Sequence, residues 1–139
     1  MHPRSYFIER IRSAGLCPTR QRIALAKLLF QGENRHVTAE MLYKEAMSEK
    51  MTVSLATVYN TLHQFTEAGM LREITVDANR SYFDTNTRSH HHFYFEKNGN
   101  LGDIPDGMIS VDKLPEAPEG TIIKSVEVVI TIADSNNDY

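Results

Sequence analysis

Cysteine is nearly absent from this 139-residue chain, in which Cys17 is the only one. A single cysteine permits no internal disulfide, and it cannot supply the thiolates of an all-cysteine zinc site. Sparing use of cysteine suits a protein of a reducing compartment, so we expect a cytoplasmic location.

The chain also has no run of 18 consecutive apolar residues, the length associated with a transmembrane helix. Its first residues, Met1 to Arg4, contain no apolar segment of the kind found in a signal peptide. We therefore expect no membrane partner. Hydrophobic and charged contents of 41% and 24% are ordinary for a soluble globular protein, and the length allows one domain or two small ones.

A large excess of one charge is missing too, since the formal net charge is only −3. The charge is nevertheless uneven. Residues 1–76 contain 10 Lys/Arg and 7 Asp/Glu, whereas residues 77–139 contain 5 and 11. A mildly basic first half and an acidic second half indicate two parts with different roles. The basic excess is too small to establish nucleic-acid binding by itself.

The first half carries the signals of four helices. Thr19, Thr38 and Ser54 each precede a segment with helical spacing, and their hydroxyls are suited to cap a helix N-terminus. Gly15 and Gly69 follow such segments, as glycine commonly does at a helix C-terminus. Helices are therefore predicted over residues 4–14, 20–30, 39–47 and 55–68.

The last of these helices has two different faces. Leu55, Val58, Leu62 and Phe65 form one apolar stripe, which predicts a buried face. The opposite face is small and polar near its N-terminus, and Tyr59 flanks the stripe. Such a face suits a helix that reads base edges in the major groove. Its candidate DNA-contacting residues are Ser54, Ala56, Thr57, Tyr59 and Asn60.

A β-hairpin is predicted after the helices, with strands over residues 70–76 and 81–84 and a turn over 77–80. Helices followed by a hairpin are typical of a winged helix-turn-helix. The fold class is therefore α+β, with an N-terminal winged helix-turn-helix domain over residues 1–84.

For the rest of the chain we predict a hinge over residues 85–89 and a small α/β dimerisation and sensing domain over 90–133. This part is too small to bury a large core alone, so a homodimer would cover its strand edges. A polar, disordered tail is expected over 134–139. Within the small domain we expect strands over residues 91–96, 101–104 and 122–132, and a short helix over 111–114.

Three of the six histidines, His90, His91 and His92, stand together at the start of the first of these strands. Imidazole is a common ligand of transition metals and of haem iron. Side chains alternate along a strand, so His90 and His92 should face one way and His91 the other. A solvated polar tract is the alternative interpretation.

Three motifs carry a family resemblance. Residues 18–22 (PTRQR), 36–43 (HVTAEMLY) and 54–62 (SLATVYNTL), with the histidine strand downstream, resemble the ferric uptake regulator (Fur) superfamily. The likeness covers roughly residues 5–132. The histidine run without cysteine pairs is most similar to the rhizobial iron response regulator (Irr) branch.

The resemblance implies a dimeric winged-helix repressor that binds an AT-rich double-stranded DNA operator. Tyr59 matches the base-contacting tyrosine of the family, and Arg22 matches an arginine that contacts phosphate or groove. Asn60 stands where many relatives have arginine, so one base contact is expected to differ.

It also implies a site for a divalent metal ion (Fe, Mn or Zn). The matching positions are His36, Asp84, His90, His92 and Asp103. All five offer nitrogen or oxygen donors. Taking His90 and His92 as the H-x-H pair of the family requires one extra residue before the tract.

The sequence departs from the family in ways that affect its cofactors. Phe95 and Asn98 occupy the positions of the usual C-x-x-C pair, and no histidine follows His92. The Irr-like tract therefore implies haem as a second cofactor, bound by His90, His91 and His92. The Cys17-Pro18 dipeptide, which is similar to haem-regulatory motifs, is the alternative haem ligand.

We therefore predict a transcriptional regulator, mainly a repressor, of iron and haem homeostasis genes that responds to haem or a divalent metal. The alternative is a redox- or metal-responsive (Mn, Zn or Fe) Fur-type repressor that does not sense haem. A small metalloenzyme and an interaction module are the other interpretations. The chain has no nucleophile or base at a recognisable catalytic spacing, and it has no Gly-rich phosphate loop. The sequence therefore gives no support to the enzyme interpretation.

Overall fold

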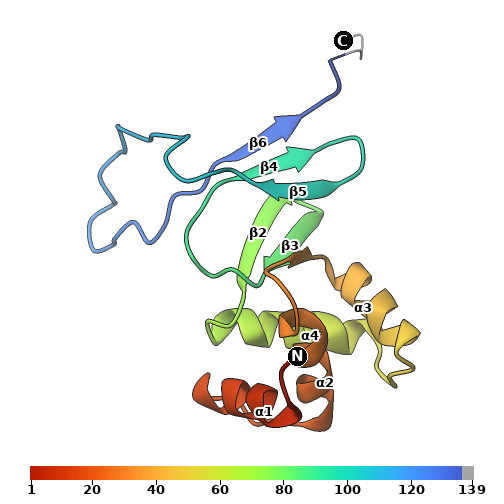
Figure 1. The fold of residues 1–139 in the computed structure, drawn as a ribbon. Coiled ribbons are helices and arrows are strands. Elements are labelled where there is room, and N and C mark those ends of the chain that lie inside the picture. Colours follow the sequence, from red (N-terminus) through yellow and green to blue (C-terminus); the bar gives the residue numbers. More distant parts are fainter. Residues whose placement is uncertain (136–139) are drawn as a thin grey trace. The chain divides into compact units, whose positions relative to one another are not determined.

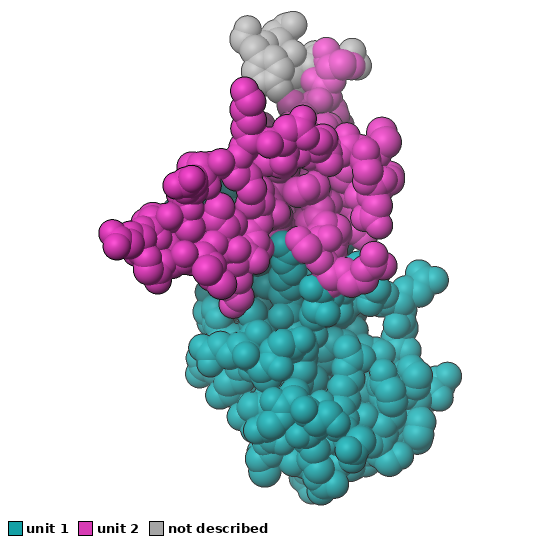
Figure 2. Space-filling model, turned by 90° about the vertical axis from the view of Figure 1, so that its left-hand side faces the viewer, with its two compact units in different colours: residues 1–87 teal, residues 88–139 magenta. Residues whose placement is uncertain are grey.

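The computed structural model describes residues 1–135 and divides the chain into two compact units. Unit 1 comprises residues 1–87 and unit 2 residues 88–139, which Figure 2 shows in different colours. The division lies within the predicted hinge. Thr85, the first hinge residue, is tied to unit 1, because its N–H donates to the Arg35 carbonyl at 3.0 Å.

Unit 1 contains the four predicted helices, which pack together (Figure 1). Their bounds are α1 Arg4–Ser13, α2 Arg20–Phe30, α3 Ala39–Ser48 and α4 Leu55–Glu67. The hydroxyls of Thr19, Thr38 and Ser54 each accept a hydrogen bond from a backbone N–H in the first turn of α2, α3 and α4. These three contacts explain why the helices begin at the predicted residues.

The cap at Thr38 allows the contribution of these capping hydrogen bonds to stability to be tested. The Thr38 hydroxyl accepts from the Met41 N–H at 3.1 Å. Thr38→Ala removes that acceptor, so we expect the free energy of unfolding to fall by about 1 kcal/mol. Urea denaturation followed by circular dichroism measures the change. Thr38→Ser keeps the hydroxyl and should stay close to the wild type; equal losses in both variants would contradict the capping role.

The core of unit 1 lies among the four helices and includes Phe83, which follows them in the sequence. Val58, Leu62 and Phe65 of α4 are fully buried, as predicted. Leu55 is the exception, since its side chain is 41% exposed and the predicted stripe begins one turn later. Leu55 is the first residue of α4 and does not belong to the core cluster that contains Val58, Leu62 and Phe65.

The predicted hairpin is present as β2 (Arg72–Asp77) and β3 (Arg80–Asp84) (Figure 1). A two-residue strand, β1 (His36–Val37), adds to β3 and completes the wing sheet in the order β1-β3-β2. No pattern in the sequence predicts β1. Its antiparallel register pairs His36 with Asp84, which brings together two residues far apart in the sequence.

Unit 2 contains a three-stranded sheet in the order β5-β4-β6. Its strands are β4 His92–Phe95, β5 Asn100–Asp103 and β6 Val129–Ile132. Strands β4 and β5 form an antiparallel hairpin, and β6 pairs with β4 in parallel. The central strand β4 is therefore hydrogen-bonded on both edges.

Two predictions for unit 2 are wrong. Residues 111–114 form no helix, and residues 122–128 form no strand although they are rich in β-branched residues. Strand propensity is realised only where a neighbouring strand is available, and β4 pairs with four residues of this run. The predicted tail lies partly outside the described residues, which end at 135. Within residues 1–135, no helix has the length and apolar character needed to cross a membrane.

Candidate nucleic-acid interface and metal-binding residues

The polar face of α4 is exposed, as its predicted role requires. Ser54, Ala56 and Asn60 are exposed, Thr57 is half-buried, and the Tyr59 side chain is 46% exposed. Ser54 already has a structural role, because its hydroxyl accepts from the Thr57 N–H and donates to the Thr57 hydroxyl. We call α4 with this face the reading helix.

Tyr59 is supported from beneath by other rings. Its ring centroid lies 4.6 Å from that of His63 and 6.4 Å from that of Phe83, which is buried on β3. These contacts restrict the rotamers of Tyr59. The side chain is therefore held in place before any ligand binds, which lowers the entropy cost of an intermolecular contact.

Arg22 connects two helices of unit 1. Its Nη1 donates to the Cys17 carbonyl at 2.9 Å, and its Nη2 donates to Gln64 Oε1 at 2.9 Å. The contact to Gln64 links α2 to the reading helix. A guanidinium has further N–H donors, so these two bonds are compatible with a phosphate contact but also give Arg22 a structural role.

The first of two groups of candidate metal ligands lies in unit 1 and consists of His36 and Asp84. His36 Nε2 lies 3.3 Å from Asp84 Oδ2, and the aspartate side chain is almost fully buried. The other oxygen of Asp84 accepts from the Asn86 N–H at 2.8 Å. Strand pairing between β1 and β3 fixes this first half-site.

The second half-site lies in unit 2 and consists of His90, His92 and Asp103. The Nε2 atoms of His90 and His92 lie 3.0 Å and 3.5 Å from the same oxygen of Asp103. The β4–β5 register pairs His92 directly with Asp103. The two imidazole rings lie 4.3 Å apart, so the sequence prediction that they face the same way is confirmed.

The Nδ1 atoms of both rings already have oxygen partners. His90 Nδ1 lies 2.6 Å from the Arg88 carbonyl, and His92 Nδ1 lies 3.1 Å from Glu127 Oε1. A carbonyl or carboxylate oxygen can only accept, so each Nδ1 has a partner for its proton, while each Nε2 faces Asp103. A cation that takes the place beside Asp103 would bind the Nε2 atoms and leave the protons on Nδ1. Glu127 was not predicted from the sequence, because it belongs to no motif and lies 35 residues from His92.

His91 has a different environment from its neighbours. Its Nδ1 accepts a hydrogen bond from the Val128 N–H at 2.9 Å, which connects β4 to the chain just before β6. A ring that accepts at Nδ1 carries its proton on Nε2. His91 therefore offers no free lone pair to a metal while this hydrogen bond persists.

The positions of the usual cysteine pair have structural roles of another kind. Phe95 is the last residue of β4, and Asn98 forms a turn in which its side-chain oxygen accepts from the Asn100 N–H at 3.1 Å. A local hydrogen bond therefore closes the loop between β4 and β5. Cys17, the alternative haem ligand, is exposed and has no disulfide partner.

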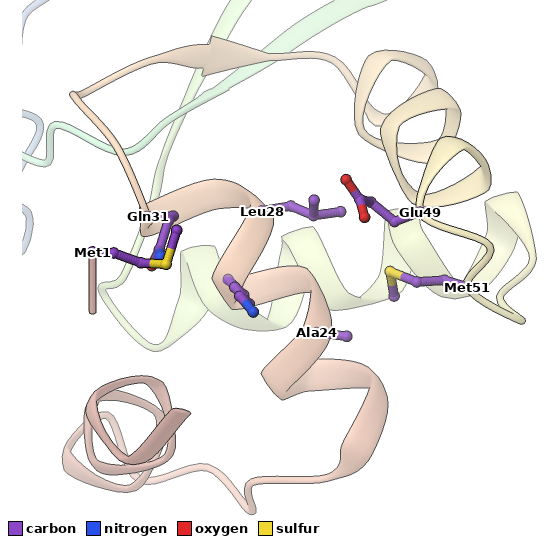
Figure 3. Close-up of a pocket in the computed structure, with 7 residues that line it drawn as sticks. Met1, Ala24, Leu28, Gln31, Glu49 and Met51 are labelled. Carbon is purple, nitrogen blue, oxygen red and sulfur yellow. The ribbon is translucent and has the colours of Figure 1, made fainter. Parts of the chain in front are cut away.

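Unit 1 also has a pocket of about 420 Å³ beside α2, which Figure 3 shows in close-up. The Gln31 amide lines this pocket. Its oxygen and nitrogen are buried and have no hydrogen-bond partner in the described part of the chain. The pocket shares no residue with the reading helix or with either half-site. Its labelled lining residues are Met1, Ala24, Leu28, Gln31, Glu49 and Met51.

A peroxide-responsive repressor, PerR of Staphylococcus epidermidis, is 35% identical to this chain over 97 residues. The match covers 70% of this chain and 64% of that protein, so the chain spans less than two thirds of the relative's length.

Solved structures of ferric uptake regulators are also similar to this chain. The ferric uptake regulator of Pseudomonas aeruginosa with manganese is 26% identical, with a TM-score of 0.70 over 93% of this chain and 98% of that one. The ferric uptake regulator of Vibrio cholerae, 21% identical, shares the fold with a TM-score of 0.72 over 91% of this chain and 98% of that one.

The sequence profile described as the Ferric uptake regulator family matches residues 13–131. Proteins of that family regulate transcription and are not enzymes, which decides against the metalloenzyme interpretation. The matched range includes the reading helix and all the residues of both half-sites. This chain therefore belongs to the ferric uptake regulator family.

Proposed function

We propose that this protein is a cytoplasmic, DNA-binding transcriptional repressor whose affinity for its operator is controlled by a divalent metal ion. The observation that carries the proposal is the presence of a histidine–carboxylate half-site in each unit. His36 and Asp84 belong to unit 1, and His90, His92 and Asp103 belong to unit 2.

One ion bound by both half-sites would restrict the arrangement of the two units. A ligand shifts a conformational equilibrium by the difference in its affinity for the two states. An ion that needs donors from both units binds well only when they are held together. Metal binding would thereby select the arrangement in which the reading helices of a dimer can bind DNA.

The donors also indicate the class of ion. Three imidazoles and two carboxylates suit Mn, Fe or Zn rather than a soft ion such as Cu(I), which prefers sulfur. The related structure from P. aeruginosa contains manganese. The similarity to a peroxide-responsive repressor supports the redox- or metal-responsive alternative as strongly as an iron-responsive one.

Haem sensing, which the Irr-like tract implies, is a more specific version of this proposal. Haem ligation by His91 Nε2 would require the proton of the ring to move to Nδ1, and Nδ1 would then lose its hydrogen bond from the Val128 N–H. Exposed Cys17 offers a sulfur ligand that needs no such rearrangement. Haem binding through His90 and His92 would compete with the divalent metal for the same Nε2 atoms.

A homodimer is the proposed form of the repressor. Unit 2 exposes several large apolar side chains in its described part, including Ile122, which is 86% exposed, and Met108, Leu114 and Ile123. Exposed apolar residues of this kind commonly mark an interface. Two copies would present two reading helices to successive turns of an AT-rich operator.

The test is a DNA-binding titration with Mn²⁺, Fe²⁺, Zn²⁺ and haem in parallel, on duplexes selected from a random library. At least one divalent ion should increase affinity, and added salt should reduce it because phosphate contacts release counterions. Equal affinity with and without every effector would contradict metal control. A flat salt response would contradict DNA binding.

Tyr59→Ala tests the reading helix in the same assay. We expect operator affinity to fall by about tenfold or more, as for the loss of one base contact worth about 1–3 kcal/mol. Metal affinity should not change, because Tyr59 belongs to neither half-site. Tyr6→Ala, on α1, is the matched control and should leave operator affinity unchanged; equal effects of both variants would show that the helix is misassigned.

A further inference from the structure

We propose that Glu127 is a positioning residue for the metal site: it fixes the tautomer of His92 so that Nε2 presents a lone pair to the metal ion. This inference rests on the proposed metal-binding function. It adds a residue that belongs to none of the motifs by which the chain resembles its family.

The contact joins two segments of unit 2. Glu127 Oε1 lies 3.1 Å from His92 Nδ1, whereas Asp103 Oδ1 lies 3.5 Å from His92 Nε2. Two carboxylates thus stand at opposite nitrogens of one ring. In the neutral ring only one nitrogen carries a proton, so the two carboxylates compete for the donor.

The surroundings favour Glu127 in this competition. Its side chain is 21% exposed, whereas that of Asp103 is 54% exposed. A hydrogen bond shielded from water is stronger than one that water screens. When a cation takes the place between Nε2 and Asp103, the remaining proton of the ring lies on Nδ1, where Glu127 accepts it.

The backbone holds Glu127 in this position. Its neighbour Val128 donates its N–H to His91 Nδ1 at 2.9 Å and accepts from the His92 N–H at 3.1 Å. The histidine tract thus forms two hydrogen bonds to the residue next to Glu127. His91 therefore has a structural role in this arrangement: it anchors the segment that carries the carboxylate.

The tautomer matters because a cation binds only the unprotonated nitrogen. Without Glu127, the proton of His92 would move to Nε2 and donate to Asp103, which is the wrong form for binding a metal. Carboxylates that accept from the second nitrogen of a ligating histidine typically raise metal affinity by about 10–100-fold. They also increase the basicity of the ligand.

Two variants separate positioning from direct ligation. In Glu127→Ala the acceptor is lost, and Mn²⁺ affinity should fall by about 10–100-fold. In Glu127→Gln the amide oxygen still accepts from Nδ1, so most of the affinity should be retained. Glu119→Gln, an exposed change in the same unit, is the control and should bind as the wild type does. Isothermal titration calorimetry with Mn²⁺ measures all four proteins.

A second measurement needs no metal. Long-range ¹H–¹⁵N NMR spectra of the metal-free protein at alkaline pH report which nitrogen of His92 is protonated. We expect the Nδ1–H form in the wild type and in Glu127→Gln, and a shift toward the Nε2–H form in Glu127→Ala. The same tautomer in all three proteins would overturn the proposal, and so would equal losses of affinity in the Ala and Gln variants. If the wild type binds no metal, the proposed function fails, while the tautomer result still tests the role of Glu127.

Discussion

His92→Ala is expected to reduce affinity for the divalent ion by at least about 100-fold, since even the outer partners of a ligating histidine are worth roughly 10–100-fold. The reason is the position of the ring: Nε2 converges with that of His90 on one oxygen of Asp103. Isothermal titration calorimetry with Mn²⁺ measures the loss. Operator binding by this variant should no longer respond to metal.

His2→Ala is the matched control for this prediction. His2 is exposed and stacks on Tyr6, far from either half-site in the sequence. Its replacement should leave metal affinity unchanged. If His92→Ala bound Mn²⁺ as tightly as His2→Ala, the second half-site would not be part of the metal site.

Phe65→Ala is expected to lower the free energy of unfolding by about 3–5 kcal/mol. Phe65 is fully buried in the core of unit 1 and contacts Phe30, with the ring centroids 6.4 Å apart. Removing the ring leaves a cavity beneath the reading helix. Since domains are stable by only about 5–15 kcal/mol, this loss should unfold unit 1 at moderate temperature.

Leu55→Ala provides the comparison on the same helix. Leu55 is apolar but 41% exposed, so its truncation should cost less than about 1 kcal/mol. Thermal and urea unfolding followed by circular dichroism measure both variants. A loss for Leu55→Ala as large as that for Phe65→Ala would contradict the observed division of α4 into a buried and an exposed part.

Local signals predicted unit 1 well. A hydroxyl that can cap a first turn, followed by apolar residues at helical spacing, identified α2, α3 and α4 at their first residues. Capping depends on atoms three residues apart, and it is therefore visible in the sequence. The hairpin β2–β3 was predictable for the same reason, because a short polar turn separates its two strands.

Long-range contacts were not predictable from such signals. Strand β1 is two residues long and exists only because β3 pairs with it. Residues 122–127 have strand propensity but pair with no strand among residues 1–135. Glu127 reaches His92 only because β6 pairs in parallel with β4, a choice that no local pattern encodes.

The candidate metal residues came from the family resemblance, and the structure brings them together within each unit. Strand registers pair His36 with Asp84 and His92 with Asp103. That all five residues bind a single ion stays a proposal, and the proposed metal control depends on it.

Metal stoichiometry in His36→Ala, His92→Ala and the double variant tests that claim most directly. Manganese content per chain is measured by equilibrium dialysis and electron paramagnetic resonance. A single shared ion predicts that each replacement weakens the same ion, and that their free-energy effects are not additive in the double variant. If His36→Ala left the ion of the histidine tract at full affinity, the two half-sites would be separate and the proposed link between the units would be wrong.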